Sequence, residues 1–197
     1  MYIGSVYTDQ DELLIAISKL YLEGKAFDLD PTFNKGGFYR KLGRPRIIGD
    51  LKPKHKWVKE MDVTQLPWEL WNLESIIFDP PYNVGDGKMV QRYGGYSSVQ
   101  EMFVFFDTAM DNFHRVLRPG GTLVIKVQDT SVGGQNFWNH IHFINYGVTA
   151  CFELIDLFIL VNQQKMDNGK PSRMARKEHC YFLVFKRIER AIRIKKF

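Results

Sequence analysis

One short stretch of the chain, Asp79-Pro80-Pro81-Tyr82, has residue types and spacing that could hold an amine for reaction. It follows the apolar run Ile76–Phe78, which reads as the end of a buried strand. The Asp79 carboxylate can accept one N–H bond. The main-chain carbonyl of Pro80 can accept another, because proline fixes the backbone and brings no N–H of its own. Tyr82 adds an aromatic face on which a nucleobase could stack. Preorganised acceptors of this kind stabilise the charge that develops on an attacking amine.

The chemistry that needs such acceptors is transfer of a group to the exocyclic amino nitrogen of a base. The lone pair of that nitrogen is delocalised into the ring, so the catalyst must draw it toward tetrahedral geometry and hold it in line. In open α/β sheets, ligands collect at the carboxyl ends of strands, and the tetrapeptide falls at such an end. The alternative reading is a rigid turn that ends the strand and has no catalytic role.

Composition indicates one globular domain. The chain has 197 residues, of which 45% are hydrophobic, and we assign residues 1–187 to a single domain and 188–197 to a basic tail. Cys151 and Cys180 lie in apolar runs, which favours buried free thiols, and no His or Cys spacing suits a metal. The longest apolar-rich stretch, 148–161, carries two acids and is too short to span a bilayer. We therefore expect a cytoplasmic protein with no membrane contact and no metal.

The elements that must position the tetrapeptide alternate between strands and helices. The pattern predicts strands that end in Asp30, Asp50 and Asp79, and helices over about 8–24, 98–117 and 136–146. Further strands are expected at 122–129, 152–161 and 179–187. Alternation of this kind predicts a mostly parallel twisted sheet with helices on both faces. The last two strands are joined only by a polar loop, so they should form an antiparallel β-hairpin.

The tetrapeptide after a buried strand resembles motif IV of the N6-adenine and N4-cytosine DNA methyltransferases, the amino-methyltransferase family. The later block Val116-Leu-Arg-Pro-Gly-Gly-Thr-Leu-Val-Ile-Lys-Val also looks like the junction of a helix and strand 5 in that family. The resemblance implies the Rossmann-like class I fold. It implies methyl transfer from S-adenosylmethionine to a base, with adenine N6 in DNA as the expected target, by base flipping and direct transfer. RNA adenine or cytosine N4 methylation, and a non-catalytic partner subunit that binds nucleic acid, are the alternatives. The Asp of the motif favours adenine, because N4-cytosine enzymes often have Ser there.

The same resemblance implies a set of residues that bind S-adenosylmethionine. In that family, the loop after the first strand approaches the methionine part of the cofactor. An acid after the second strand binds the ribose hydroxyls, and a later acid contacts the adenine amine. These residues are Asp28, Asp30, Thr32, Gly36, Gly37, Asp50 and Asp62. The usual Asp/Phe-x-Gly-x-Gly pattern is absent, and the stretch is more similar to a phage and bacterial variant that begins Asp-Pro-Thr-Tyr-Ser-Lys-Gly.

Two loops remain for contact with nucleic acid, which the net charge of +5 suits. The first is the glycine-rich loop at 83–97. The second is the basic loop at 163–178, whose cations could contact phosphate. The expected residues are Arg92, Tyr93, Tyr96, Lys170, Arg173, Arg176 and Lys177. We favour DNA over RNA as the partner. These loops leave no room for a separate recognition region. The target would therefore be recognised with low sequence specificity, in a form whose bases are already exposed, or with the help of a second copy in a homodimer or a partner subunit.

Overall fold

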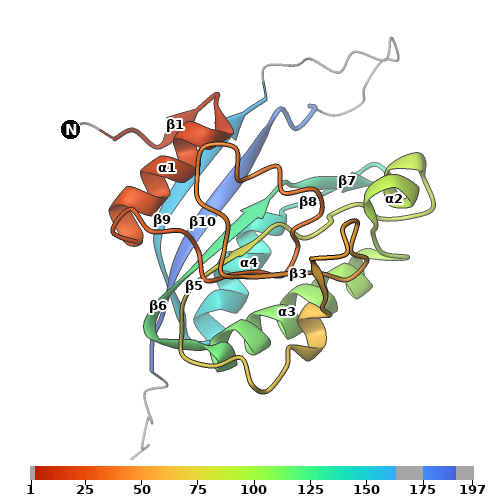
Figure 1. Ribbon diagram of the computed structural model, residues 1–197. Helices are drawn as coiled ribbons and strands as arrows, with labels where there is room; N and C mark the ends of the chain where they lie inside the picture. Colours follow the sequence, from red (N-terminus) through yellow and green to blue (C-terminus); the bar gives the residue numbers. More distant parts are fainter. Residues whose placement is uncertain (1–2, 163–174, 190–197) are drawn as a thin grey trace, which may run out of the picture.

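The computed structural model describes residues 3–162 and 175–189. Its main feature is an eight-stranded sheet with the order β1-β9-β10-β6-β5-β2-β3-β4 (Figure 1). The strands are β1 (Val6–Tyr7), β2 (Leu29–Asp30), β3 (Ile47–Asp50), β4 (Lys59–Glu60), β5 (Leu73–Phe78), β6 (Leu117–Val127), β9 (Phe152–Val161) and β10 (His179–Arg187). A separate small hairpin joins β7 (Thr130–Val132) to β8 (Gln135–Phe137).

The sheet is parallel except at β10, which pairs antiparallel with both β6 and β9. The predicted fold class is therefore confirmed, including the closing hairpin. Strands β5 and β2 are neighbours in the sheet. The strand that follows β2 in the chain lies on one side of this pair, and the strand that follows β5 lies on the other, so the strand order reverses between them. A reversal of this kind opens a crevice at the carboxyl ends of the two strands, and ligands bind there in open α/β sheets.

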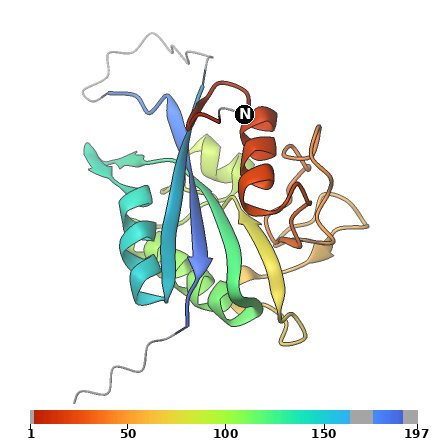
Figure 2. The same cartoon turned by 90° about the vertical axis from the view of Figure 1, so that its left-hand side faces the viewer.

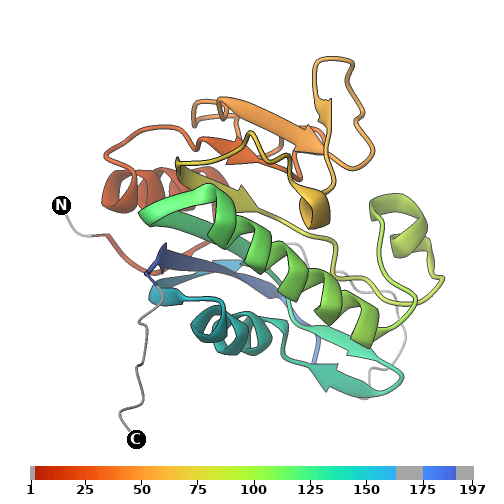
Figure 3. The ribbon, with the colours of Figure 1, turned by 90° about the horizontal axis from the view of Figure 1, so that it is seen from below.

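Helices cover both faces of the sheet and bury one apolar cluster on each side. Helix α1 (Gln10–Tyr21) packs on one face, and α3 (Val99–Val116) and α4 (Asn139–Thr149) lie together on the other, as Figures 2 and 3 show. A short helix α2 (Lys88–Tyr93) and the 3-10 turn η1 (Val63–Gln65) complete the elements of the described chain. None of the described helices is long and apolar enough to cross a membrane.

Capping residues explain where the two long helices start. Asp9 caps α1 by accepting bonds from the backbone N–H groups of Asp11 and Glu12, one residue later than the pattern indicates. Ser98 caps α3 and accepts from the Glu101 N–H, while the Glu101 carboxylate reaches back to Ser97. Helix α3 packs its apolar face against β5 and β6.

Candidate active site

Two carboxylates from neighbouring strands meet at the point where the sheet order reverses. Asp30 ends β2, and Asp79 follows β5 directly. On the other side of β5, Phe78 pairs with Ile125 of β6, so Lys126 lies level with Asp79. The three side chains line a pocket of about 230 Å³ together with Thr32 and Phe38. Parallel pairing of three strands thus brings two acids and one cation to one place.

Asp79 is held from two directions. Its backbone N–H donates to the Thr32 hydroxyl at 2.9 Å, and Lys126 Nζ donates to Oδ2 at 3.3 Å. The Lys126 side chain is 17% exposed and its ammonium also lies 5.0 Å from the centre of the Phe38 ring. Burial raises the pKa of Asp79, and the charge and hydrogen bond of Lys126 act against that rise. Lys126 therefore occupies the Oδ2 atom of this carboxylate.

Asp30 is the most enclosed ionisable group of the pocket. Its residue is 2% exposed, and it accepts from the Thr32 N–H at 2.8 Å and from the Tyr39 hydroxyl at 2.6 Å. Burial raises the pKa of Asp30 to about 7, the hydrogen bonds from Tyr39 and Thr32 lower it, and the nearby charge of Asp79 raises it again. Near neutral pH this carboxyl can therefore exchange a proton, whereas an exposed aspartate is always ionised there.

The tetrapeptide is also fixed at its far end. The Thr130 hydroxyl, just after β6, donates to the Tyr82 carbonyl at 2.9 Å. Asn139 Nδ2 in turn donates to that hydroxyl at 2.7 Å and to the Gln128 carbonyl at 2.8 Å. The residues from 79 to 82 are thus tied to β2 through Thr32 and to the carboxyl end of β6 through Thr130. A segment held at both ends presents its acceptors in one orientation.

Residues 73–195 match a family model described as DNA methylase, that of the N6 and N4 methyltransferases. This match covers more than half of the chain and includes the whole Asp79–Tyr82 segment. The chain belongs to this family of DNA methylases. No curated protein matches the methylase sequence.

Among solved structures that are similar to this chain, NodS shares the fold. The N-methyltransferase NodS from Bradyrhizobium japonicum WM9 is 17% identical over 88% of this chain and 93% of NodS, with a TM-score of 0.54. The cytosine-N4-specific PvuII DNA methyltransferase is 19% identical over 64% of this chain and 47% of its own, with a TM-score of 0.48. TTHA0409 of Thermus thermophilus, assigned as a DNA modification methylase and solved with S-adenosyl-L-methionine, is 20% identical over 64% of this chain and 52% of its own, with a TM-score of 0.45. The chain spans about half the length of these last two proteins.

Several residues that the resemblance assigned to the cofactor surround the pocket. Thr32 and Gly37 line it, and a side chain at Gly37 would meet nothing within 4 Å. Gly36 is needed by its own loop, because it has a φ of +72° and a Cβ there would lie 2.4 Å from the Phe33 ring. Asp50 holds the same loop, since its carboxylate accepts from the N–H groups of Asn34 and Lys52, both at 2.8 Å.

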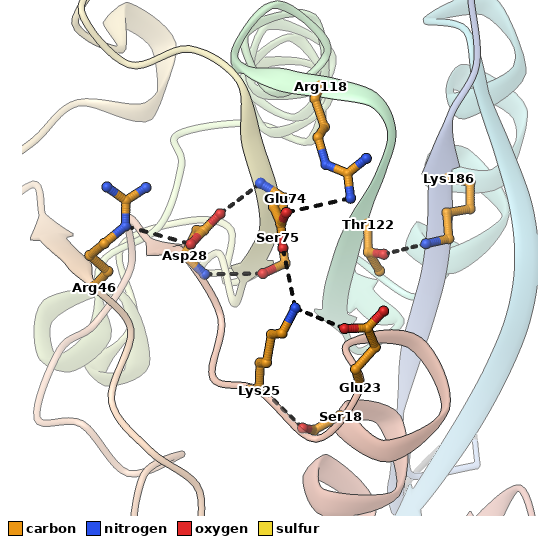
Figure 4. Close-up of polar contacts among 10 residues, drawn as sticks. All are labelled: Ser18, Glu23, Lys25, Asp28, Arg46, Glu74, Ser75, Arg118, Thr122 and Lys186. Atoms are coloured by element: carbon orange, nitrogen blue, oxygen red, sulfur yellow. Dashed lines mark hydrogen bonds and ion pairs between the residues drawn. The ribbon is translucent and has the colours of Figure 1, made fainter.

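Asp62 and Asp28 have local partners. Asp62 caps η1 and accepts from the N–H and the hydroxyl of Thr64. Asp28 lies at the amino end of the sheet, where its carboxylate accepts from the Glu74 N–H at 2.6 Å and pairs with Arg46 at 3.6 Å (Figure 4). The structure does not bring Asp28 to the pocket, because β2 starts after it and its side chain points toward the start of β5. We therefore do not assign it to the cofactor.

The residues expected to contact nucleic acid differ in where they lie: one is buried, two lie near the surface, and the side chains of the other four are outside the described part. Tyr96 is 7% exposed and packs against Phe105 and Phe106 in the core, so its ring is not offered to a nucleic acid and we do not assign it to that surface. Arg92 and Tyr93 belong to α2, and their side chains lie outside the described part, as do Lys170 and Arg173. Arg176 is exposed and Lys177 half-buried just before β10. Among the described residues no cluster of three His, Cys, Asp or Glu could hold a metal ion.

Lys126 is the site residue that the sequence reasoning missed. It stands inside the apolar strand segment 123–127, where a lone lysine is unusual and needs a partner. That signal was readable from the sequence, but its partner was not, because the register between β5 and β6 decides which acid it meets.

Proposed function

We propose that the methylase transfers a methyl group from S-adenosylmethionine to adenine N6 in DNA, with the target base flipped out of the helix and held at Asp79. The observation that carries the proposal is the pair of Asp79 and Lys126 beside Asp30 in the crevice where the sheet order reverses. Family membership supports the reaction class, and the Asp of the tetrapeptide supports adenine over cytosine. We place the activity in one domain, residues 1–187.

The pocket suits the methionine part of the cofactor. The carboxylate of Asp30 matches a cationic ammonium, and Lys126 matches a carboxylate. The volume of about 230 Å³ is below the roughly 300–1,000 Å³ of whole-ligand clefts, so the adenosine part would extend over the open Gly37 side toward Asp50. When bound, S-adenosylmethionine supplies an electrophilic methyl group on sulfur.

The chain's own residues perform the positioning. Asp79 Oδ1 accepts one N–H of the target amine, while Lys126 keeps the other oxygen occupied and the carboxylate ionised. The Pro80 carbonyl accepts the second N–H, so the nitrogen lone pair is directed at the methyl group. Tyr82 is partly buried against the core and limits how the base can sit. The nitrogen would gain a bond to the methyl carbon as the bond from that carbon to sulfur breaks, and it would then lose one proton to water.

The decisive experiment offers labelled S-adenosylmethionine with unmethylated double-stranded DNA, single-stranded DNA and total RNA in parallel. Nucleoside mass spectrometry then identifies the product, and we expect N6-methyladenine in DNA. N4-methylcytosine, or label in RNA alone, would overturn the adenine or DNA assignment. Absence of transfer together with absence of cofactor binding would favour the non-catalytic partner subunit.

Asp79→Ala tests the site itself. We expect it to abolish transfer, with a loss of at least about 100-fold, because the preorganised acceptor for the amine is gone. Cofactor affinity, measured by calorimetry, should change much less. The matched control is Asp28→Asn, which alters a carboxylate at the opposite, amino end of the strands and should keep the wild-type rate. Full activity in Asp79→Ala would remove Asp79 from the mechanism.

A further inference from the structure

A group of aromatic and cationic side chains gathers beyond the carboxyl end of β6, on segments that the proposed reaction does not use. The group, here called the Trp138 face, consists of Trp138, His140, Lys177 and Tyr181. His140 stacks on Tyr181 with ring centres 4.1 Å apart and planes inclined by 24°. The Lys177 ammonium lies 4.7 Å from the centre of the Trp138 ring. Trp138 is 48% exposed, so part of a large aromatic ring stays open to solvent.

Buried polar groups hold this face rigid. Asp129 has a side chain only 2% exposed, and its Oδ1 lies 2.7 Å from Nδ1 of His140. Gln128 Nε2 donates to the carbonyls of Lys177 at 2.8 Å and His179 at 3.0 Å, which fixes the segment that carries Lys177. Among the described residues, Asp129 Oδ2 and Asn139 Oδ1 are buried without a hydrogen-bond partner, so this network is only partly satisfied. The bonds that are made still hold His140 against Asp129 and the Lys177 segment against Gln128.

The Trp138 face is attached to the catalytic segment. Asn139, next to Trp138, donates to the Thr130 hydroxyl, and Thr130 donates to the Tyr82 carbonyl. Two hydrogen bonds thus join the start of α4 to the end of the tetrapeptide. The Trp138 face is therefore connected to the end of the segment that is proposed to hold the target base.

We propose that the Trp138 face binds an unpaired nucleotide next to the target base, with its base stacked on the exposed Trp138 ring and its phosphate at Lys177. Every base has an aromatic face, so stacking on Trp138 requires no particular sequence. A lysine beside the ring matches the charge of the backbone, as cations near aromatic rings do in single-strand binding grooves. This inference rests on the proposed function, because it takes nucleic acid as the substrate.

The test measures binding without methyl transfer. A short fluorescent single-stranded oligonucleotide is titrated with the protein in the absence of cofactor, and anisotropy reports the dissociation constant. We expect Trp138→Ala to weaken binding by about 5-fold to 100-fold, the loss that removal of one stacked base gives. The matched control is Trp68→Ala, because Trp68 is 80% exposed but lies in the segment that leads into the amino end of β5. It should leave the dissociation constant unchanged.

Lys177→Gln gives a second, independent readout. Loss of one phosphate contact should reduce the slope of the logarithm of affinity against the logarithm of salt concentration by about 0.7, the value for one contact to a single strand. A merely structural lysine would not change this slope.

The outcomes separate the inference from the proposed function. If the wild type binds and methylates nucleic acid while Trp138→Ala binds as tightly as Trp68→Ala, the inference is wrong and the function stands. If the wild type neither binds nor methylates any nucleic acid, both fail, and the exposed ring would instead suit a protein partner. A weakened Trp138→Ala together with a wild-type Lys177→Gln slope would overturn the phosphate contact.

Discussion

At the scale of the residue, the pair of Asp79 and Lys126 predicts how activity depends on pH. An ionised Asp79 is the stronger acceptor for an amine N–H, burial raises its pKa, and Lys126 counteracts that rise. Lys126→Met removes the counteracting charge, so the pKa of Asp79 rises further and the acid limb of the pH profile of kcat moves to higher pH. At pH 7 we expect a loss of tenfold or more, since a hydrogen bond to a charged group contributes ~1.5–3 kcal/mol.

The sign of this effect and its control distinguish it from simple damage to the fold. Raising the pH should restore activity in Lys126→Met, because the ionised form returns above the raised pKa. Lys126→Arg keeps the positive charge and should retain a profile close to that of the wild type. The other titratable groups near the pair, Asp30, Tyr39 and Cys180, are unchanged in both variants. Superimposable profiles for Met and Arg would show that the lysine charge does not act on Asp79.

At the scale of the element, the carboxyl end of β6 positions the tetrapeptide. Thr130→Val deletes the donor to the Tyr82 carbonyl and the acceptor for Asn139, whereas Thr130→Ser keeps both. We expect the Val variant to lose about tenfold in kcat, because a segment freed at one end no longer holds its acceptors aligned. Steady-state kinetics with a thermal melt as the folding control tests this. Equal rates in the two variants would mean that Tyr82 is positioned by other contacts.

Elements with long apolar patterns could be predicted from the sequence. The helix expected at 98–117 is α3 (Val99–Val116), and the strands expected at 152–161 and 179–187 are β9 and β10. The strand expected to end in Asp30 has only two residues, β2 (Leu29–Asp30), because Asp28 and its predecessors bond to the start of β5 and to neighbouring turns. Two-residue strands carry no period of their own, so β1 (Val6–Tyr7) and β4 (Lys59–Glu60) arise only from pairing in the folded sheet.

The short elements near the site escape prediction for similar reasons. Helix α4 begins at Asn139, three residues later than expected, because residues 130–137 form the β7–β8 hairpin around Gly133 and Gly134, which both have positive φ. Helix α2 stands inside the glycine-rich loop, where no apolar period marks it. For the site, the tetrapeptide motif pointed to Asp79, and the order of segments in the family that the sequence resembles pointed to Asp30. The contacts of Lys126 and of the Trp138 face depend on register and on turns that the sequence does not specify locally.

At the scale of the whole molecule, the buried acid at the strand reversal should make stability depend on pH. The pKa of Asp30 lies at about 7 in the folded chain against 3.8 for an unperturbed aspartate, because burial raises it more than its hydrogen bonds lower it. The folded state therefore binds more protons than the unfolded state between these values, and the free energy of unfolding should fall as pH rises through that window. The difference corresponds to roughly 4 kcal/mol, a large share of the ~5–15 kcal/mol that a domain of this size has.

Urea unfolding of the cofactor-free protein at pH 5 and pH 8 measures this dependence. The wild type should be less stable at pH 8, and Asp30→Asn should lose much less stability between the two values, because an amide keeps the acceptor for the Thr32 N–H but carries no charge to bury. Asp28→Asn, a partly buried carboxylate at the amino end of the strands, serves as the control and should follow the wild type. Parallel stability curves for the wild type and Asp30→Asn would mean that the Asp30 carboxylate stays ionised in the fold. Its hydrogen bonds from Thr32 and Tyr39 would then outweigh burial, and the pocket would present two permanent negative charges to a cationic methyl donor.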